Sequence, residues 1–445
     1  MITGLHLENY GTFVDVDWDL THRAQAKNVV ALYGENGAGK THLLRPLAQL
    51  SQSIDTLSLR RVIMAQLSRD EDESSPTVSP SILRQFNQTN TSIEQIFHHS
   101  FTIDSVGDSV IRVDFDNKEL AEHSGSTGYY ELAFNAQHQL KRETLYGIIN
   151  VRSGIIYQIE HLDETIEAKL NQRIFTNNTL NAELENSIQQ FWGKHTLLSV
   201  INLALKDNNH QYLGESIGAS VWQALRQLRE LSYSIEGTSR QYRHDYLVEP
   251  LSSGVLGASD AAQLDTTEKA LNALFPQLYS DIISLRYDRH PHGDRIDYQL
   301  ISRKNIWGKI KDVPFNLESD GTKRLLRLVP LLADAMSGKT VVIDEIDTGI
   351  HDLLMLTLIE AISEQISGQL IFSTHNTMLL NALKPDSAYV IQEDTDGQKY
   401  VVSITDVKQV KRNNNVQKMY LNGDFMGIPY TGFLDLNEVF HGTTK

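Results

Sequence analysis

The stretch Gly34-Glu35-Asn36-Gly37-Ala38-Gly39-Lys40-Thr41 decides how this sequence folds. Before it stands Asn28–Tyr33, an apolar run with the length and β-branched content of a buried strand. After it, Leu43, Leu44 and Leu47 share one face of a predicted helix. Glycines between a strand and a helix let backbone N–H groups converge on phosphates, and the helix N-terminus adds positive potential. In this setting the pattern G-x-x-x-x-G-K-[ST] predicts a phosphate-binding loop.

The same loop predicts which side chains meet a nucleotide. Lys40 neutralises the β- and γ-phosphates, and the Thr41 hydroxyl is a ligand for Mg²⁺. Pro46 is expected to kink the following helix or to limit its first turns. The residues expected to bind the nucleotide are Gly34, Glu35, Asn36, Gly37, Ala38, Gly39, Lys40, Thr41 and His42.

A second apolar run, Thr340–Ile343, ends in the two acids Asp344 and Glu345. Such a strand delivers carboxylates to the carboxyl edge of a sheet, where α/β proteins bind ligands. Asp344 is expected to hold Mg²⁺ through water. Glu345 is expected to polarise the attacking water, because phosphoryl transfer needs a positioned nucleophile. Together with the loop, this strand predicts phosphoryl transfer to water with Mg²⁺ as a cofactor.

Two further segments carry weaker signals. Ser319-Asp320-Gly321-Thr322 precedes a predicted helix over Lys323–Leu332 and can offer a hydroxyl and N–H groups to a phosphate, although an ordinary N-cap explains the same residues. His375 follows the predicted strand Leu370–Ser373. A lone histidine is usually part of the core or the surface, but at this edge it can bridge the γ-phosphate and the water.

The order of these four segments resembles the head of ABC-type ATPases. LHLENYGTF at 5–13, and SDGTKRLL at 319–326 in place of the transporter motif LSGGQ, are similar to the SMC, RecF and OLD group. VVIDEIDTGIH at 341–351 and KRNNNVQKMYLNGDFMGIPY at 411–430 resemble the stand-alone ABC-type ATPases of bacterial anti-phage and abortive-infection systems. In size and architecture the chain is most similar to the AriA family, the ATPase subunits of PARIS systems, with retron-associated and Septu-type ATPases as close rivals.

This resemblance implies an α/β fold: a split ABC-type P-loop ATPase head, with a mixed β-sheet core and flanking helices, interrupted by a mainly helical insertion. The expected segments are an N-terminal lobe with the phosphate loop (1–150), the insertion (151–278), a C-terminal lobe with the other motifs (279–400) and a tail (401–445).

Apolar side chains recur at helical spacing in the insertion. The set Ile155, Ile159, Leu162, Ile166, Leu170 and Ile174 predicts one helix, and Leu180–Phe191 and Ile217–Leu228 predict two more. Outside the insertion, strands are expected at 101–106, 110–115, 129–134, 282–287 and 297–301.

The resemblance also implies a composite site, because in such heads two subunits sandwich two ATP molecules. Ser319 and Gly321 of one chain would cap the γ-phosphate held by Lys40 of the other. Asp347 would lie at the dimer contact, and His375 would act as the switch histidine.

Two assignments implied by the family stay open at this point. Asn9 and Tyr10 can lie near the base or ribose, but a structural turn explains them equally well. For the glutamine of the Q-loop, Gln66, Gln85 and Gln88 are all candidates.

The amino-acid composition excludes several classes of function. The 445 residues contain no cysteine, which excludes disulfides, thiol catalysis, Fe–S clusters and Cys-ligated zinc. With 40 Lys and Arg against 56 Asp and Glu, the net charge of −16 does not suit a whole-surface grip on nucleic acid. No run of about 18 apolar residues and no basic leader is present, so we expect a cytoplasmic protein without a membrane partner.

Two clusters of polar residues have a functional and a structural interpretation. Asp288, His290, His292 and Asp294 could bind a metal, but a hairpin turn explains them as well. The basic cluster of Arg226, Arg229, Arg240 and Arg243 could touch DNA or an acidic partner, or could simply be solvated surface.

The favoured function is an ATPase that acts as sensor and scaffold of an anti-phage defence system. We expect a homo-oligomer, at least an ATP-sandwich dimer and compatible with a hexamer built as a trimer of dimers. Its further partners would be a separate toprim-type effector nuclease and a phage trigger protein, because the 70 residues after His375 are too few for a nuclease domain. The alternative is a RecF- or Rad50-like DNA-repair ATPase, which makes DNA a less favoured partner.

Overall fold

The computed structural model describes residues 1–72, 90–116, 127–150, 152–162, 165–206, 210–241, 246–410 and 414–428. Within them the chain forms an α/β fold with a 7-stranded mixed sheet and three antiparallel sheets, of 7, 4 and 2 strands. This confirms the predicted α/β fold class, with a mixed β-sheet core and flanking helices. No helix of the described part is long and apolar enough to cross a membrane.

The central sheet has the strand order β12-β11-β17-β18-β5-β19-β20. Its five inner strands run parallel, and an antiparallel strand closes each edge. Every residue of β5, β17 and β18 is buried, as expected for parallel strands covered on both faces. The strands are β5 (Val29–Tyr33), β11 (Ser232–Ile235), β12 (Thr238–Arg240), β17 (Thr340–Ile343), β18 (Gln369–Ser373), β19 (Ala388–Glu393) and β20 (Lys399–Ser403).

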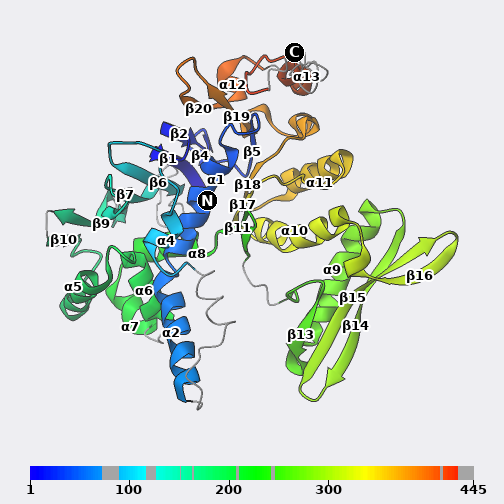
Figure 1. Ribbon diagram of the computed structural model, residues 1–445, viewed down its shortest axis with the longest axis horizontal. Helices are drawn as coiled ribbons and strands as arrows, with labels where there is room; N and C mark the ends of the chain where they lie inside the picture. Colours follow the sequence, from blue (N-terminus) through cyan, green and yellow to red (C-terminus); the bar gives the residue numbers. More distant parts are fainter. Residues whose placement is uncertain are drawn as a thin grey trace, which may run out of the picture.

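Alternate residues of these strands point into two separate cores. Val30 and Leu32 pack with the apolar face of α1 (Lys40–Ser53), whereas Val29 and Ala31 pack on the side of α10 (Asp320–Met336) and α11 (Asp352–Gln365). Figure 1 shows α10 and α11 on one face of the sheet and α1 on the other. α1 continues through Pro46 for two further turns, so the proline does not end it.

The N-terminal lobe is an antiparallel sheet of order β10-β9-β8-β7-β6-β1-β2. Its strands are β1 (Ile2–Tyr10), β2 (Phe13–Asp19), β6 (Ser109–Asp116), β7 (Thr127–Phe134), β8 (Leu140–Ile149), β9 (Arg152–Leu162) and β10 (Thr165–Leu170). β6 and β7 confirm two predicted strands. In the predicted strand at 101–106, only Phe101 forms a bridge, to Tyr10.

The helix predicted from Ile155 to Ile174 is wrong, because this segment forms the hairpin of β9 and β10. A spacing of four residues satisfies the two-residue period of a strand as well as the helical period. The single spacing of three separates the alternatives: Ile159 is fully buried, whereas Leu162 is 42% exposed, as residues on opposite faces of a strand are. β9 pairs with β8, so this hairpin extends the N-terminal sheet beyond residue 150.

The other two helices predicted in the insertion are confirmed as α5 (Asn178–Phe191) and α8 (Ala219–Arg229). Between them lie α6 (Leu197–Lys206) and α7 (His210–Ser216). Leu180, Leu184 and Ile188 form the buried face of α5, as their spacing predicts. The helical part of the insertion therefore begins at α5. Towards the N-terminus, α2 (Thr56–Asp72) and α4 (Ile93–Phe97) complete this lobe.

A third sheet stands beside α10, at the lower right of Figure 1. It consists of β13 (Ser253–Gly257), β14 (Ile282–His292), β15 (Arg295–Ile306) and β16 (Lys309–Pro314), and α9 (Ala262–Leu278) packs on β14. β14 and β15 confirm the predicted strand pair. Its turn carries the predicted metal candidates, but among the described residues no three His, Asp or Glu side chains gather to hold a metal ion. The hairpin interpretation explains them.

One buried carboxylate ties the N-terminal sheet to the helical part of the insertion. Glu143 is fully buried on β8 and accepts hydrogen bonds from Tyr130 (3.0 Å), Tyr157 (2.8 Å), Trp192 Nε1 (2.8 Å) and the backbone N–H of Leu197 (2.9 Å). Burial raises the pKa of Glu143, and these donors oppose the rise. All four groups lose this acceptor if the carboxylate is removed.

Glu143→Ala is therefore expected to destabilise the fold by about 3–5 kcal/mol, the cost of orphaning several buried polar partners. Urea unfolding monitored by tryptophan fluorescence measures this loss, because Trp192 is one of the partners. Glu131→Ala, which removes the half-buried partner of Arg142 on neighbouring β7, is the control and should cost far less. Equal losses for the two variants would contradict the role given to Glu143.

Candidate active site

The phosphate loop joins β5 to α1, as predicted. Gly37 (φ 80°) and Gly39 (φ 108°) have left-handed backbone conformations that side chains other than glycine rarely adopt. A Cβ atom at residue 39 would lie only 2.6 Å from Thr12 Oγ1, so space as well as conformation requires glycine there. The loop thereby approaches β2 closely and turns directly into the N-terminus of α1.

Lys40 points back into this loop. Its Nζ donates to the carbonyl oxygens of Gly34 (3.0 Å) and Glu35 (2.9 Å), and the residue is only 7% exposed. Burial lowers the pKa of Lys40, whereas the carboxylate of Asp344 opposes this. A buried ammonium held only by carbonyl dipoles is a strong partner for phosphate oxygens.

Thr41 and Asp344 meet from segments 303 residues apart. Thr41 Oγ1 donates to Asp344 Oδ2 (2.7 Å), and Ser373 Oγ donates to the other carboxylate oxygen (2.5 Å). Because β5, β17 and β18 are parallel neighbours, their carboxyl ends bring these three side chains to one edge. A hydroxyl beside a carboxylate is the oxygen donor set that Mg²⁺ prefers, so these residues fit the predicted metal.

Glu345 lies next to this pair at the end of β17. Its backbone has φ of 49°, and its N–H donates to Ser373 Oγ (2.8 Å), which fixes the turn after the strand. Thr348 Oγ1 donates to Glu345 Oε2 (3.0 Å). The side chain is exposed, so the carboxylate is open to water. Both the geometry and the exposure suit a residue that orients an attacking water.

His375 follows β18 at the same edge. The ring is exposed, and burial of part of it lowers the pKa of His375, an effect that the charge of Lys40 reinforces. At neutral pH the imidazole is therefore uncharged and can accept or donate a hydrogen bond. The carboxylate of Asp347 opposes this lowering of the His375 pKa. The buried Oδ1 of Asp347 has no hydrogen-bond partner in the described structure.

Ser319 and Gly321 stand at the N-terminus of α10. Ser319 is the N-cap, accepts from the N–H of Thr322 (3.2 Å) and remains exposed. A Cβ at Gly321 would lie 2.3 Å from the carbonyl oxygen of Gly349, so this glycine also allows the helix to touch the loop after β17. The N-cap interpretation is thus correct for the isolated chain, and the exposed hydroxyl is still accessible to a second chain.

A cavity of about 1050 Å³ connects these elements. Thr41, Asp344 and Glu345 line one side, and the first turns of α10 line the other with Asp320 and Arg324. The structure thus gathers Thr41 at the start of α1, the acidic pair and the N-terminal part of α10 around one space.

Three contributors were missed in the sequence. Ser373 contacts both Asp344 and the Glu345 backbone, Thr348 binds the Glu345 side chain, and the Arg324 guanidinium reaches the Glu345 carbonyl oxygen (3.5 Å). Ser373 could have been predicted in the same way as Asp344, because it too ends a buried strand, β18, which lies beside β17. The other two carry no signal beyond ordinary loop and helix composition.

Asn9 and Tyr10, the candidates for contacting the base or ribose, make contacts within the chain instead. Tyr10 is fully buried, and its hydroxyl donates to Gln49 (2.5 Å), while Asn9 (φ 48°) donates to the carbonyl of Asp108 (2.8 Å). These contacts support the structural turn. Of the Q-loop candidates, Gln85 and Gln88 lie outside the described residues, as does the side chain of Gln66.

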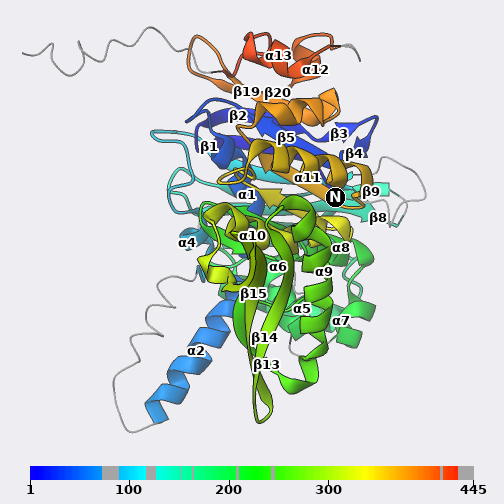
Figure 2. The ribbon, with the colours of Figure 1, turned by 90° about the vertical axis from the view of Figure 1, so that its right-hand side faces the viewer.

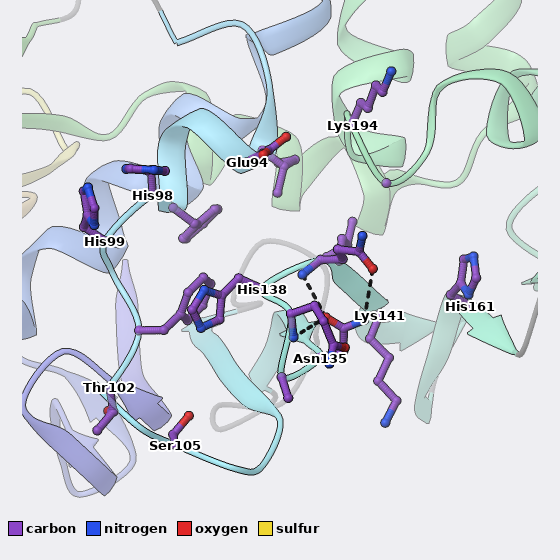
Figure 3. Close-up of a pocket in the computed structure, with 18 of the residues that line it drawn as sticks. Glu94, His98, His99, Thr102, Ser105, Asn135, His138, Lys141, His161 and Lys194 are labelled. Atoms are coloured by element: carbon purple, nitrogen blue, oxygen red, sulfur yellow. Dashed lines mark hydrogen bonds between the residues drawn. The ribbon is translucent and has the colours of Figure 1, made fainter.

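A second cavity, of about 1180 Å³, lies on the N-terminal lobe and shares no lining residue with the phosphate loop (Figure 3). Its rim carries His98, His99, His138, His161, Lys141 and Lys194. His138 stacks on Phe101, with the ring centroids 4.6 Å apart. Size therefore does not identify the active site here, because the larger cavity lacks the loop and the acidic pair.

Comparison with known proteins gives one family match and a set of similar structures. Residues 29–381 match the family described as "AAA domain, putative AbiEii toxin, Type IV TA system". The chain is similar to an Smc head domain with an extended coiled coil bound to the C-terminal domain of ScpA, from Pyrococcus furiosus (11% identity, TM-score 0.42, 90% of this chain and 95% of that chain). It is also similar to the SMC head domain from Thermotoga maritima (12% identity, TM-score 0.36, 91% and 98%). No curated protein matches at a significant level.

Proposed function

This chain belongs to the family of AAA domains described as putative AbiEii toxins of type IV toxin–antitoxin systems, and from that premise we propose that it binds and hydrolyses ATP in a site completed by a second copy of itself. The observation that carries the proposal is the meeting of Lys40, Thr41, Asp344 and Glu345 at one edge of the central sheet. Those four side chains are the groups that phosphoryl transfer to water requires.

In this mechanism Lys40 and the N–H groups of the loop bind the phosphates. Thr41 and Asp344 hold Mg²⁺, which when bound supplies a Lewis acid that stabilises the charge developing on the phosphoryl oxygens. Ser373 orients the Asp344 carboxylate. Glu345 accepts the proton of the attacking water, and neutral His375 hydrogen-bonds beside it.

The second copy is proposed because one chain leaves parts of the site open to solvent. Glu345 and Ser319 are both exposed. Leu317, two residues before Ser319, and Leu353, in the first turn of α11, are 71% and 55% exposed. Coverage of these apolar side chains by a second copy would be consistent with the proposed dimer. In the proposed dimer, Ser319 and Gly321 of one chain face the phosphates held by Lys40 of the other, with Asp347 at the contact.

We further propose that the ATPase serves as the sensor and scaffold of an anti-phage system of the PARIS type. A separate toprim-type nuclease would be the effector, and a phage protein the trigger. The family description, which names a toxin–antitoxin system, supports this direction. A gene for a toprim-type nuclease beside this one, whose product co-purifies with this chain, is the expected result. A neighbouring membrane permease gene instead would overturn the assignment.

The basic cluster that includes Arg240 and Arg243 gives little support to the DNA-repair alternative. Arg240 is engaged within the chain, since it donates to the carbonyl oxygen of Ser51 (3.1 Å) and pairs with Asp55 (3.0 Å). Arg243 lies outside the described residues. Binding to a DNA duplex that weakens steeply with salt would favour the alternative.

A further inference from the structure

The outer side of the phosphate loop is covered by the C-terminal part of the chain. β19 lies beside β5, with Val390 paired to Tyr33, and Ile391 lies 3.5 Å from the position of a Cβ on Gly34. β20 follows as the edge strand and begins with Lys399. In the upper part of Figure 2, β19 lies beside β5, and β20 lies beyond β19, below α12 and α13. The β19–β20 edge of the central sheet thus flanks the phosphate loop on the side of β5 away from β17.

Lys399 makes one direct contact with the loop. Its Nζ donates to the carbonyl oxygen of Gly37 (2.9 Å), across 362 residues of sequence, and its side chain is only 12% exposed. The one acid paired with it, Glu393, is 4.0 Å away and 59% exposed, and such a pair contributes little to stability. The hydrogen bond to the Gly37 carbonyl oxygen is therefore the contact that best accounts for the position of the Lys399 ammonium.

This contact fixes one peptide group of the loop from both sides. The carbonyl of the Gly37–Ala38 peptide accepts from Lys399, while the N–H of the same peptide donates to the Glu35 carbonyl oxygen (3.2 Å). That same oxygen accepts from Lys40. Lys40 thus binds the loop through the Glu35 carbonyl oxygen, and Lys399 binds it through the Gly37 carbonyl oxygen. Gly37 has φ of 80° and a freely accessible backbone, so without this contact the peptide can turn readily.

We propose that Lys399 is a positioning residue for nucleotide binding, which holds the Gly37–Ala38 peptide in its binding orientation and adds a second positive charge beside the phosphates. This inference rests on the proposed function, because it requires the loop to bind ATP. Lys399 acts through the Gly37 carbonyl and not on the reacting atoms. It therefore contributes to affinity, equally for ATP and ADP, and leaves the hydrolysis step itself unchanged.

The test compares three variants of the full-length protein. Lys399→Met keeps the aliphatic stem and removes the charge and the hydrogen bond, while Lys399→Arg keeps both. Lys408→Met is the matched control, because Lys408 belongs to the same C-terminal segment but pairs with Asp424 (3.0 Å) away from the loop. The measurements are Kd for ATP and ADP by calorimetry, kcat at saturating ATP, and Tm without nucleotide.

Lys399→Met should raise both Kd values by about tenfold and leave kcat unchanged, while the nucleotide-free Tm should fall slightly because the lost hydrogen bond is also present without nucleotide. Lys399→Arg should restore most of the affinity, and Lys408→Met should match the wild type. A wild-type Kd for Lys399→Met, or a fall in Tm that Lys399→Arg does not repair, would overturn the inference. If the unmodified protein binds no ATP at all, the proposed function itself fails, which is a different outcome.

Discussion

The Lys40→Ala protein is expected to bind ATP about a hundredfold more weakly than the wild type, or not at all. Its ammonium is buried among the carbonyl oxygens of Gly34 and Glu35, where the phosphates enter, and no other ammonium contacts the inner side of the loop in the described structure. Losing a buried charge that pairs with a charged ligand costs about 2–5 kcal/mol. Calorimetry with ATP and Mg²⁺ measures the change.

Lys169→Ala is the control for the removal of a lysine, because Lys169 is exposed on β10 in the N-terminal sheet. The nucleotide-free Tm of Lys40→Ala should stay close to that of the wild type, since the loop keeps its glycine conformations and its contact with Lys399. ATP binding at wild-type affinity would show that the phosphate loop is not the nucleotide site.

The Glu345→Gln protein is expected to bind ATP normally and to hydrolyse it about 10²–10⁴-fold more slowly, the usual contribution of a general base. Glutamine has the same shape, so Thr348 can still donate to its side-chain oxygen. Only the capacity to accept a proton is lost. Phosphate release at saturating ATP gives the rate, and mass photometry shows whether ATP now accumulates a dimer.

Glu360→Gln on the exposed face of α11 makes the same chemical change away from the site and should leave the rate unaltered. Hydrolysis by Glu345→Gln at the wild-type rate would exclude Glu345 as the base, whatever the state of assembly.

The phosphate loop, the acidic pair and His375 could be predicted from the sequence because each follows a short, buried and mostly apolar strand. Once such strands are parallel neighbours, their carboxyl ends coincide, which is why Thr41 and Asp344 meet across 303 residues. The helix expected at Ile155–Ile174 failed for the opposite reason. Apolar residues four apart obey two periods at once, and the pairing of β9 with β8 shows that the strand period applies.

Contacts that bridge distant segments left no trace in the sequence. Lys399 lies in an unremarkable polar turn and strand, and Glu143 lies in a strand of mixed composition. Their partners are defined only by the fold: the Gly37 carbonyl for one, and two tyrosines and a tryptophan for the other. Roles that depend on the partner's backbone or on several elements at once could not have been predicted from spacing.

In the proposed mechanism each ATP site is shared between two chains. Two inactive variants test it when mixed: Lys40→Ala, and Ser319→Asp, which retains a good N-cap for α10 but sets a negative charge against the partner's phosphates. In a mixed dimer one site combines the intact Lys40 of one chain with the intact Ser319 of the other. The mixture should therefore regain up to about a quarter of the wild-type ATPase rate per chain, as random pairing in a symmetric dimer allows. A mixture no more active than either variant alone would contradict the shared site.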